Sequence, residues 1–226
     1  MKTIGILGGM GPEASADLYL KLIQRSYRRA GQDMGGYPHI WINNIPVPNI
    51  FQQGERPIGP YLGEQVRLLE QAGAQVIGIA CNSAHFCFDD MQRALLGTAT
   101  LVHMIDEVAE RTRSDGARTV GVLSSTVARP LYMRAIEALG LQAAPLAPAE
   151  QEQVERIISS VLGGVRTPAL KQDLKDLADA QAAGGADCVV LGCTDLPIIL
   201  SQADVGYPLY SSTEVLADAL FDLATA

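Results

Sequence analysis

Two of the four cysteines, Cys81 and Cys193, lie in loops of similar sequence and are the residues best suited to chemistry. Each ends a short apolar run and precedes small polar residues, in Ala80-Cys81-Asn82-Ser83 and Gly192-Cys193-Thr194-Asp195. A thiol has a reference pKa of about 8.5, so one member of a close pair can be ionised while the other stays protonated. Such a pair can remove a proton from one face of a carbon atom and return a proton to the opposite face.

The residues that follow each cysteine predict that a helix begins there. Asn82, Ser83, Thr194 and Asp195 are all of types that cap helix N-termini well, and Pro197 suits a first helical turn. The N-terminus of a helix lowers the pKa of a nearby thiol, because peptide dipoles and free N–H groups stabilise the thiolate. The loops are therefore predicted to favour ionisation of the two cysteines.

The remaining residues with reactive or aromatic side chains have simpler interpretations. His85, in the loop of Cys81, either tunes the thiolate, contacts a ligand or is an ordinary polar residue of a first helical turn. His39 and His103 flank apolar segments without a partner at metal-ligand spacing, so structural roles are predicted for both. Trp41 lies beside a predicted strand and is expected to contribute to packing.

Strand and helix patterns alternate along the whole chain. Short apolar and β-branched runs predict buried strands at residues 3–7, 40–45, 76–80, 119–123 and 188–191. Apolar residues at three- and four-residue steps predict helices at residues 13–29, 63–72, 106–113, 131–139, 151–162, 170–183 and 213–223. This alternation predicts an α/β fold with parallel sheets that are covered by helices on both faces.

An internal repeat relates the two halves of the sequence. Thr3-Ile4-Gly5-Ile6-Leu7 returns as Thr119-Val120-Gly121-Val122-Leu123, and each cysteine follows a glycine of a Gly-Ala pair, Gly73 or Gly185, by eight residues. Chance similarity between common loop sequences is the alternative. The repeat predicts two similar α/β halves, residues 1–100 with 210–226 and residues 101–209, related by a pseudo-two-fold axis. The active site is expected between them, at the carboxyl ends of the strands.

Composition narrows the class of protein. A formal net charge of −8, with 17 scattered lysines and arginines, argues against nucleic acid as a partner. The chain has no run of about twenty apolar residues to cross a bilayer, and its first residues suit a strand rather than a signal peptide. A cytoplasmic protein without membrane contact and with a small-molecule substrate is predicted.

The four cysteines are too sparse for a disulfide scaffold and lack the CxxC pairs of a zinc site. No metal site is therefore predicted. Cys87 and Cys188, which have no matched loops, are interpreted as small buried hydrophobic residues.

Three motifs together resemble the aspartate/glutamate racemase family. They are Gly5-Ile6-Leu7-Gly8-Gly9-Met10-Gly11-Pro12, Ala80-Cys81-Asn82-Ser83-Ala84-His85 and Leu191-Gly192-Cys193-Thr194-Asp195-Leu196, in the order found in the family. The resemblance implies a two-domain α/β isomerase, usually a homodimer, that racemises amino acids without pyridoxal phosphate, metal or any other cofactor. It implies that Cys81 and Cys193 are the catalytic pair. It also places six residues in the substrate site: Met10, Gly11, Asn82, Ser83, Thr126 and Thr194.

The sequence departs from the family where aspartate racemases typically carry an arginine and a lysine for the side-chain carboxylate of the substrate. Val47-Pro48-Asn49-Ile50 stands in place of the stretch with the arginine, and Gly163-Gly164 stands near the lysine position. Arg129 is the predicted replacement, and Arg56 and Arg166 are two further candidates. The alternative is that these arginines are ordinary exposed residues. Aspartate or glutamate is the expected substrate.

Other functions are compatible with parts of the sequence. Gly9-Met10-Gly11-Pro12-Glu13-Ala14 satisfies a dinucleotide-binding pattern, but its proline removes an amide donor and the second predicted strand ends without an acidic residue. A related cysteine-dependent isomerase or decarboxylase would use the same scaffold. The presence of two cysteines argues against a decarboxylase with a single catalytic cysteine. A non-catalytic amino-acid-binding protein remains a further alternative.

Overall fold

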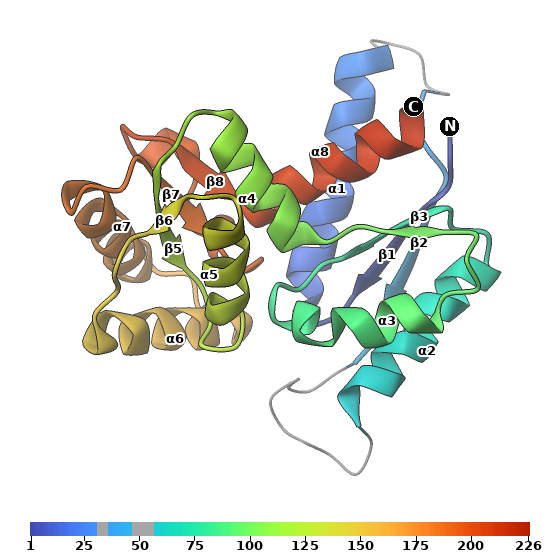
Figure 1. The fold of residues 1–226 in the computed structure, drawn as a ribbon, viewed down its shortest axis with the longest axis horizontal. Coiled ribbons are helices and arrows are strands. Elements are labelled where there is room, and N and C mark those ends of the chain that lie inside the picture. The colour runs from blue at the N-terminus through green and yellow to red at the C-terminus, as the bar shows by residue number, and fades with distance from the viewer. Residues whose placement is uncertain (31–35, 47–56) are drawn as a thin grey trace. The chain divides into compact units, whose positions relative to one another are not determined.

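The computed structural model describes residues 1–30, 36–46 and 57–226, which form two α/β units (Figure 1). The first unit contains Met1–Met104 and Leu216–Ala226, and the second contains Ile105–Val215. Each unit has a four-stranded parallel sheet. The predicted α/β fold with parallel sheets is confirmed.

In the first unit the strands are in the order β2-β1-β3-β4. The elements that lie wholly in this unit are β1 (Ile4–Gly8), α1 (Pro12–Ala30), β2 (Ile40–Asn44), α2 (Ile58–Gln71), β3 (Val76–Ile79), the 3₁₀ helix η1 (Ser83–Cys87), α3 (Phe88–Ala94) and β4 (Thr100–Leu101). The last helix, α8 (Ser212–Thr225), begins in the second unit and ends in the first.

In the second unit the order is β6-β5-β7-β8, which repeats the topology of the first sheet. Its elements are α4 (Met104–Ser114), β5 (Thr119–Leu123), α5 (Arg129–Ala138), β6 (Gln142–Ala143), α6 (Pro148–Leu162), α7 (Pro168–Ala183), β7 (Cys188–Leu191), η2 (Leu196–Ile198), η3 (Gln202–Asp204) and β8 (Leu209–Ser211). By position in the sheet, β1 corresponds to β5 and β3 corresponds to β7.

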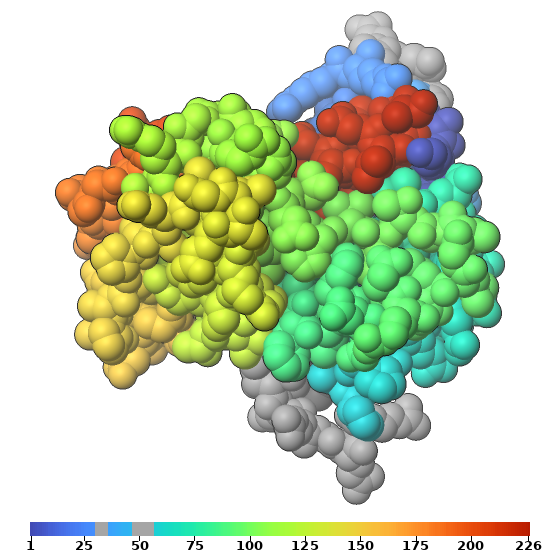
Figure 2. Space-filling model, viewed as in Figure 1, coloured from blue at the N-terminus to red at the C-terminus, as the bar shows by residue number. Residues whose placement is uncertain are grey.

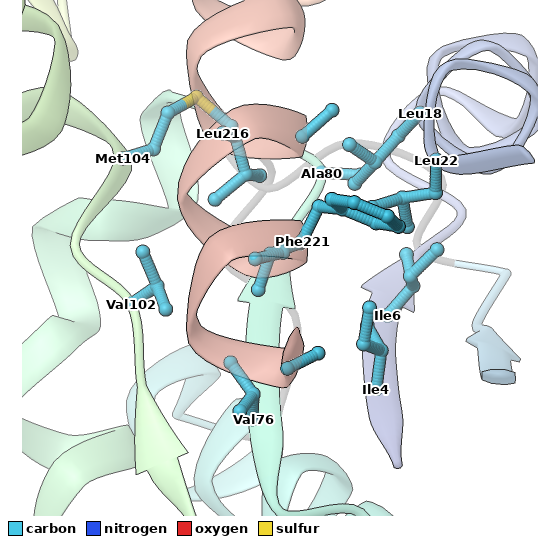
Figure 3. Packing of buried hydrophobic residues seen from close by; sticks show 13 residues of the cluster. Ile4, Ile6, Leu18, Leu22, Val76, Ala80, Val102, Met104, Leu216 and Phe221 are labelled. Carbon is cyan, nitrogen blue, oxygen red and sulfur yellow. The ribbon is translucent and has the colours of Figure 1, made fainter. Parts of the chain in front are cut away.

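Helices cover both faces of the first sheet. Ile4 and Ile6 of β1 face Leu18 of α1 and Phe221 of α8 on one side (Figure 3). α2 and α3 pack on the other side, where Leu62, Val66, Leu69 and Met91 are buried against the strands. Such burial is the main stabilising term, at about 1.5 to 3 kcal/mol for each large apolar side chain.

The C-terminal helix α8 is an integral part of the first unit. The N–H of Lys2 donates to the carbonyl of Ala224 at 2.7 Å, and Figure 2 shows the C-terminal residues beside the first ones. A Cβ on Gly78 of β3 would lie 2.6 Å from Leu220 Cδ1. The glycine therefore lets α8 approach the strand closely.

The second sheet is covered in the same manner. α4 and α5 pack on one face, where Val108, Tyr132 and Ile136 are buried with Val120 and Val122 of β5. α6 and α7 cover the other face through a second set of buried residues, which includes Val154, Ile157, Leu174, Leu177 and Ala178. The central strands are buried on both faces, as their continuous apolar sequences predict.

β2 is an exception to the predicted burial. The sequence predicts a buried strand and a packed Trp41, but β2 is an edge strand in which Trp41 and Ile42 are each 43% exposed. The Trp41 ring lies 5.0 Å from the ring of His39. An apolar run does not distinguish an edge strand from a central one, so these two predictions are wrong.

A buried carboxylate fixes the segment between α3 and β4. Glu70 of α2 accepts hydrogen bonds from Leu96 N–H, Ala99 N–H and both the N–H and the hydroxyl of Thr98. Burial opposes ionisation of Glu70, but these four hydrogen bonds outweigh it and lower its pKa to about 2. The segment that leads to β4 and then to α4 is thereby anchored to α2.

Candidate active site

Both matched cysteines lie at the carboxyl edge of their own sheet. Cys81 is two residues beyond the end of β3, and Cys193 is two residues beyond the end of β7. The residue before each cysteine donates its backbone N–H to the neighbouring strand, Ala80 to Leu7 and Gly192 to Leu123, at 2.8 Å in both units. The sequence repeat is therefore a repeat in backbone geometry at these two positions.

The loop after β1 lies at the same sheet edge as Cys81, because β1 and β3 are parallel neighbours. Met10 packs against the apolar cluster that contains Cys81, and Ser15 holds the loop together. Its hydroxyl accepts from Gly9 N–H at 2.9 Å and donates to the Gly11 carbonyl at 3.3 Å. The first unit thus brings the predicted residues Met10, Gly11, Cys81, Asn82 and Ser83 to one edge.

Gly9 is required by the close approach of β2. Its φ is 97°, and a Cβ would lie 2.1 Å from the carbonyl oxygen of Ile45. Any side chain at this position would push the loop away from the strand. Gly9 therefore has a packing reason that does not involve a dinucleotide.

His85 clamps the loop of Cys81 to the start of α4. Its Nδ1–H donates to the carbonyl of Cys81 at 2.9 Å, and its Nε2 accepts the N–H of Met104 at 3.1 Å, which assigns the neutral Nδ1–H tautomer. Complete burial, together with the nearby His103, lowers the pKa of His85 to about 3. Of the three interpretations considered for His85, this position supports a structural one.

His103 also has the predicted structural role. Its ring meets those of His85 and Phe88 edge to face, at centroid distances of 4.9 and 4.4 Å. His39 contacts Trp41 at the exposed edge strand.

The helix predicted after Cys81 is present, because η1 continues directly into α3, whereas the helix predicted after Cys193 is a single 3₁₀ turn. Side-chain capping of the two is a wrong prediction. η1 has five residues and η2 has three, and their N-cap residues, Asn82 and Asp195, make no side-chain capping hydrogen bond. Pro197 in the first turn of η2 is confirmed. The three-residue turn η2 carries only a small dipole, so Cys193 requires another electrostatic partner.

Asp195 is such a partner for Cys193. The thiol donates a hydrogen bond to Asp195 Oδ2, with a sulfur-to-oxygen distance of 3.7 Å. Asp195 is 3% exposed, and burial raises its pKa to about 6, against the opposing effects of the Cys193 hydrogen bond and of the positive charge of Arg166. The side chain of Cys193 itself is only partly buried.

Tyr132 of α5 forms a wall behind Cys193. Its ring is fully buried, and a Cβ on Gly192 would lie 2.7 Å from Tyr132 Cε2. Burial and the nearby Cys193 raise the pKa of Tyr132, which therefore stays a neutral phenol, hydrogen-bonded with Ser212. The cysteine loop can pass this ring only because residue 192 is glycine.

The other predicted residues of the second unit have different surroundings. Thr126 follows β5 and is exposed, and its N–H donates to Glu155 at 2.5 Å. Thr194 is buried beside Cys193 in sequence. Arg129 donates to the carbonyls of Val122 at 2.7 Å and Ala144 at 3.3 Å, so its guanidinium links the segments of β5 and β6.

Only some of the positions at which aspartate racemases typically carry the arginine and the lysine lie within the described residues. Val47–Ile50 and Arg56 lie outside the described residues. Gly163 caps the C-terminus of α6 and is exposed, and Arg166 follows in the segment before α7.

Two contributors to this site were not recognised in the sequence. The sequence predicts only a helix cap for Asp195, although its spacing of two residues from Cys193 is a usable signal. Tyr132 is 61 residues away from Cys193 in the chain, and no local pattern could connect the two.

The fold is that of an isomerase of the α/β racemase class. The model of the Asp/Glu/Hydantoin racemase family matches residues 7–220, and the chain belongs to this family. The resemblance found in the three motifs is thereby confirmed.

Individual relatives agree with this assignment. The broad specificity amino-acid racemase RacX of Bacillus subtilis (strain 168) is 24% identical over 225 residues, which cover 95% of this chain and 94% of that protein. A crystal structure of an aspartate racemase homologue from Pyrococcus horikoshii OT3 is 31% identical, with full coverage of both chains and a TM-score of 0.81. The aspartate racemase of Picrophilus torridus is 26% identical over 100% of this chain and 95% of that chain, with a TM-score of 0.84.

Among the helices of residues 1–30, 36–46 and 57–226, none has the length and apolar character needed to span a membrane.

Proposed function

We propose that this racemase interconverts the L and D forms of an acidic amino acid, with Cys81 and Cys193 as its two proton-transferring groups and without a cofactor. One observation carries the proposal: the two thiols occupy equivalent positions, two residues beyond equivalent strands, with the same 2.8 Å backbone hydrogen bond before each. The mechanism requires both thiols to reach one substrate, on opposite faces of its α-carbon.

The proposed reaction is a proton exchange between two thiols and one carbon. The thiolate of one cysteine removes the α-proton, and the electron pair of the C–H bond moves into the substrate carboxylate. The thiol of the other cysteine then gives its proton to the opposite face, so the product is the other enantiomer and the two cysteines have exchanged protonation states. Backbone N–H and hydroxyl donors of the loops at residues 9–11, 82–83 and 194 would stabilise the charge on the substrate carboxylate.

The acidic substrate is supported by the relatives and by one cation. Two of the relatives described above are named as aspartate racemase or its homologue, whereas RacX is named for broad specificity. Arg129 uses its guanidinium to bind two backbone carbonyls. Arg166 is exposed and its positive charge acts on Asp195, beside Cys193. We therefore propose Arg166, rather than Arg129, as the group that binds the side-chain carboxylate.

The resemblance to the family also supports a cytoplasmic homodimer as the working form. Neither property is needed for the test of the chemistry.

Incubation of the protein with single L- and D-amino acids in deuterated water tests this function. Aspartate or glutamate should gain one α-deuterium and lose optical purity at linked rates, without added pyridoxal phosphate or metal, as followed by mass spectrometry and chiral chromatography. Cys87→Ala removes a thiol outside the proposed pair and should keep this activity. An amino acid that binds without exchanging its α-proton would instead identify a binding protein.

Arg166→Gln should raise the KM for the acidic substrate by roughly 10- to 100-fold, which corresponds to the loss of one charged hydrogen bond of about 1.5 to 3 kcal/mol. The kcat should change much less, because the side-chain carboxylate is bound equally in the ground and transition states. Arg156→Gln, at an exposed position of α6, is the matched control. An unchanged KM in Arg166→Gln would refute the assignment of this arginine.

A further inference from the structure

We infer that Asp195 biases Cys193 toward its protonated form, so that in the free enzyme Cys193 is the proton donor of the pair. This inference rests on the proposed two-cysteine function and adds to it a positioning residue that acts only through Cys193. It also makes the two cysteines unequal, because the two loops differ in sequence at this point: Ser83 stands where Asp195 stands in the second loop.

The geometry commits the carboxyl group of Asp195 to the thiol. Its Oδ2 lies 3.7 Å from Cys193 Sγ, within the range of a hydrogen bond to sulfur. Asp195 occupies the N-cap position of η2, yet its side chain makes no capping hydrogen bond there. The residue is 3% exposed, so it is not a solvated surface acid. A role in starting the 3₁₀ turn therefore does not account for its placement.

Asp195 and Cys193 would both carry a negative charge if both were ionised, and charges of the same sign repel each other. An ionised Asp195 accepts the S–H of Cys193, which favours the thiol over the thiolate. Loss of the proton from Cys193 would place a second negative charge 3.7 Å away in a buried setting, where charges interact strongly. Burial raises the pKa of Asp195 to about 6, so the carboxyl is charged at neutral pH and becomes neutral in mild acid.

Two neighbouring groups modify this interaction. The positive charge of Arg166, between α6 and α7, lowers the pKa of Asp195 and so stabilises its carboxylate form. Tyr132 of α5 faces Cys193, but its raised pKa keeps the phenol neutral, so it adds no charge of its own in the relevant pH range. The Asp195 carboxylate is therefore the group whose removal should most directly ease formation of the Cys193 thiolate.

Thiol reactivity measures this effect without any reliance on racemisation. The rate of alkylation of Cys193 by iodoacetamide is followed from pH 5 to 10 by mass spectrometry of its peptide. In Asp195→Asn the midpoint of the Cys193 curve should fall by about one to two pH units, because a like charge is removed. At pH 7.5 the rate should then rise about tenfold or more. Asp195→Glu keeps a carboxylate and should restore most of the original curve.

Internal and external controls accompany the measurement. Cys81 is alkylated in the same sample and has Ser83 at the position that corresponds to Asp195, so its midpoint should change less than that of Cys193. Asp173→Asn removes an exposed carboxylate of α7 and controls for the change in net charge. In the unmodified protein, a plot of the logarithm of the Cys193 rate against pH should flatten near pH 6, as Asp195 ionises and favours the thiol, and should rise again at higher pH.

A Cys193 midpoint that stays the same in folded Asp195→Asn would overturn the inference. If that variant does not fold, a plot for the unmodified protein without the flattening near pH 6 overturns the inference equally. A shifted midpoint in a protein that exchanges no α-proton would leave the carboxyl–thiol pair standing and refute the proposed function instead.

Discussion

Cys81→Ser and Cys193→Ser should each abolish racemisation in both directions, with a loss of at least about 10³-fold in kcat. Every inversion needs a base on one face of the α-carbon and an acid on the other. A serine hydroxyl is too weak an acid to be ionised near neutral pH, so it cannot replace a thiolate. Loss of either thiol therefore stops the reaction from both enantiomers, although the other thiol remains.

The surviving thiolate should still remove an α-proton from the one enantiomer that presents its hydrogen to it. With a β-chloro substituent on the acidic amino acid, the electron pair of the broken C–H bond can expel chloride, and no proton donor on the opposite face is needed. The resulting enamine hydrolyses to a keto acid and ammonia. Each single variant should thus form keto acid from one enantiomer only, and the two variants should select opposite enantiomers.

Keto acid release from the separated enantiomers, measured as its hydrazone, provides the readout. The double variant should be inactive in elimination, and Cys87→Ala should behave as the unmodified protein does. Elimination from the same enantiomer by both single variants, or racemisation by either one at a near-normal rate, would mean that another group is the base.

The strand and helix alternation could be predicted because each element carries its own periodicity. The five predicted strands lie within one residue of the observed ends, and all seven predicted helices are present, although α2 begins five residues earlier than expected. β4, β6 and β8 were not predicted, because two or three residues are too few to show an alternating pattern. They form only where a longer neighbouring strand offers unpaired backbone groups.

Residues of the candidate site could be predicted where their neighbours in the sequence indicate the chemistry. They could not be predicted where the site depends on contacts between residues far apart in the sequence. The cysteine loops are recognisable from the repeat alone. The contacts of Arg129 with Val122 and Ala144 depend on how α5 packs on its sheet, and sequence spacing does not encode this. Asp195 was assigned to a cap because capping is the commonest use of an aspartate before a turn, whereas burial beside a thiol gives it another partner.

The second large effect concerns His85, whose replacement by glutamine should remove a loss of stability that begins as the pH falls below 6.5. Folded His85 has a pKa of about 3, against 6.5 for the free side chain. Below pH 6.5 the unfolded chain binds this proton and the folded chain does not, so stability is fully present above pH 6.5 and falls as the pH is lowered toward 3. The slope approaches about 1.4 kcal/mol per pH unit.

Glutamine is the informative substitution because it can keep both hydrogen bonds. Its amide NH₂ can donate to the Cys81 carbonyl, and its oxygen can accept from Met104 N–H, but it does not titrate. Removal of the clamp altogether, as in His85→Leu, would leave the Cys81 carbonyl and the Met104 N–H buried without this partner, at a cost of about 1 to 3 kcal/mol for each unsatisfied group. Comparison of the two variants separates the proton from the hydrogen bonds.

Urea unfolding at pH 7.0, 6.0 and 5.0 supplies the measurement. From pH 7 to 5 the unmodified protein should lose about 2 kcal/mol more than His85→Gln does. The difference between the two proteins is required because Asp195, whose folded pKa is raised to about 6, takes up a proton in the folded state and adds stability as the pH falls below 6 in both. His39→Gln, the same change at an exposed position, should keep the slope of the unmodified protein. Equal slopes in His85→Gln and the unmodified protein would show that His85 is protonated in the folded state and does not hold the Cys81 loop as a neutral clamp.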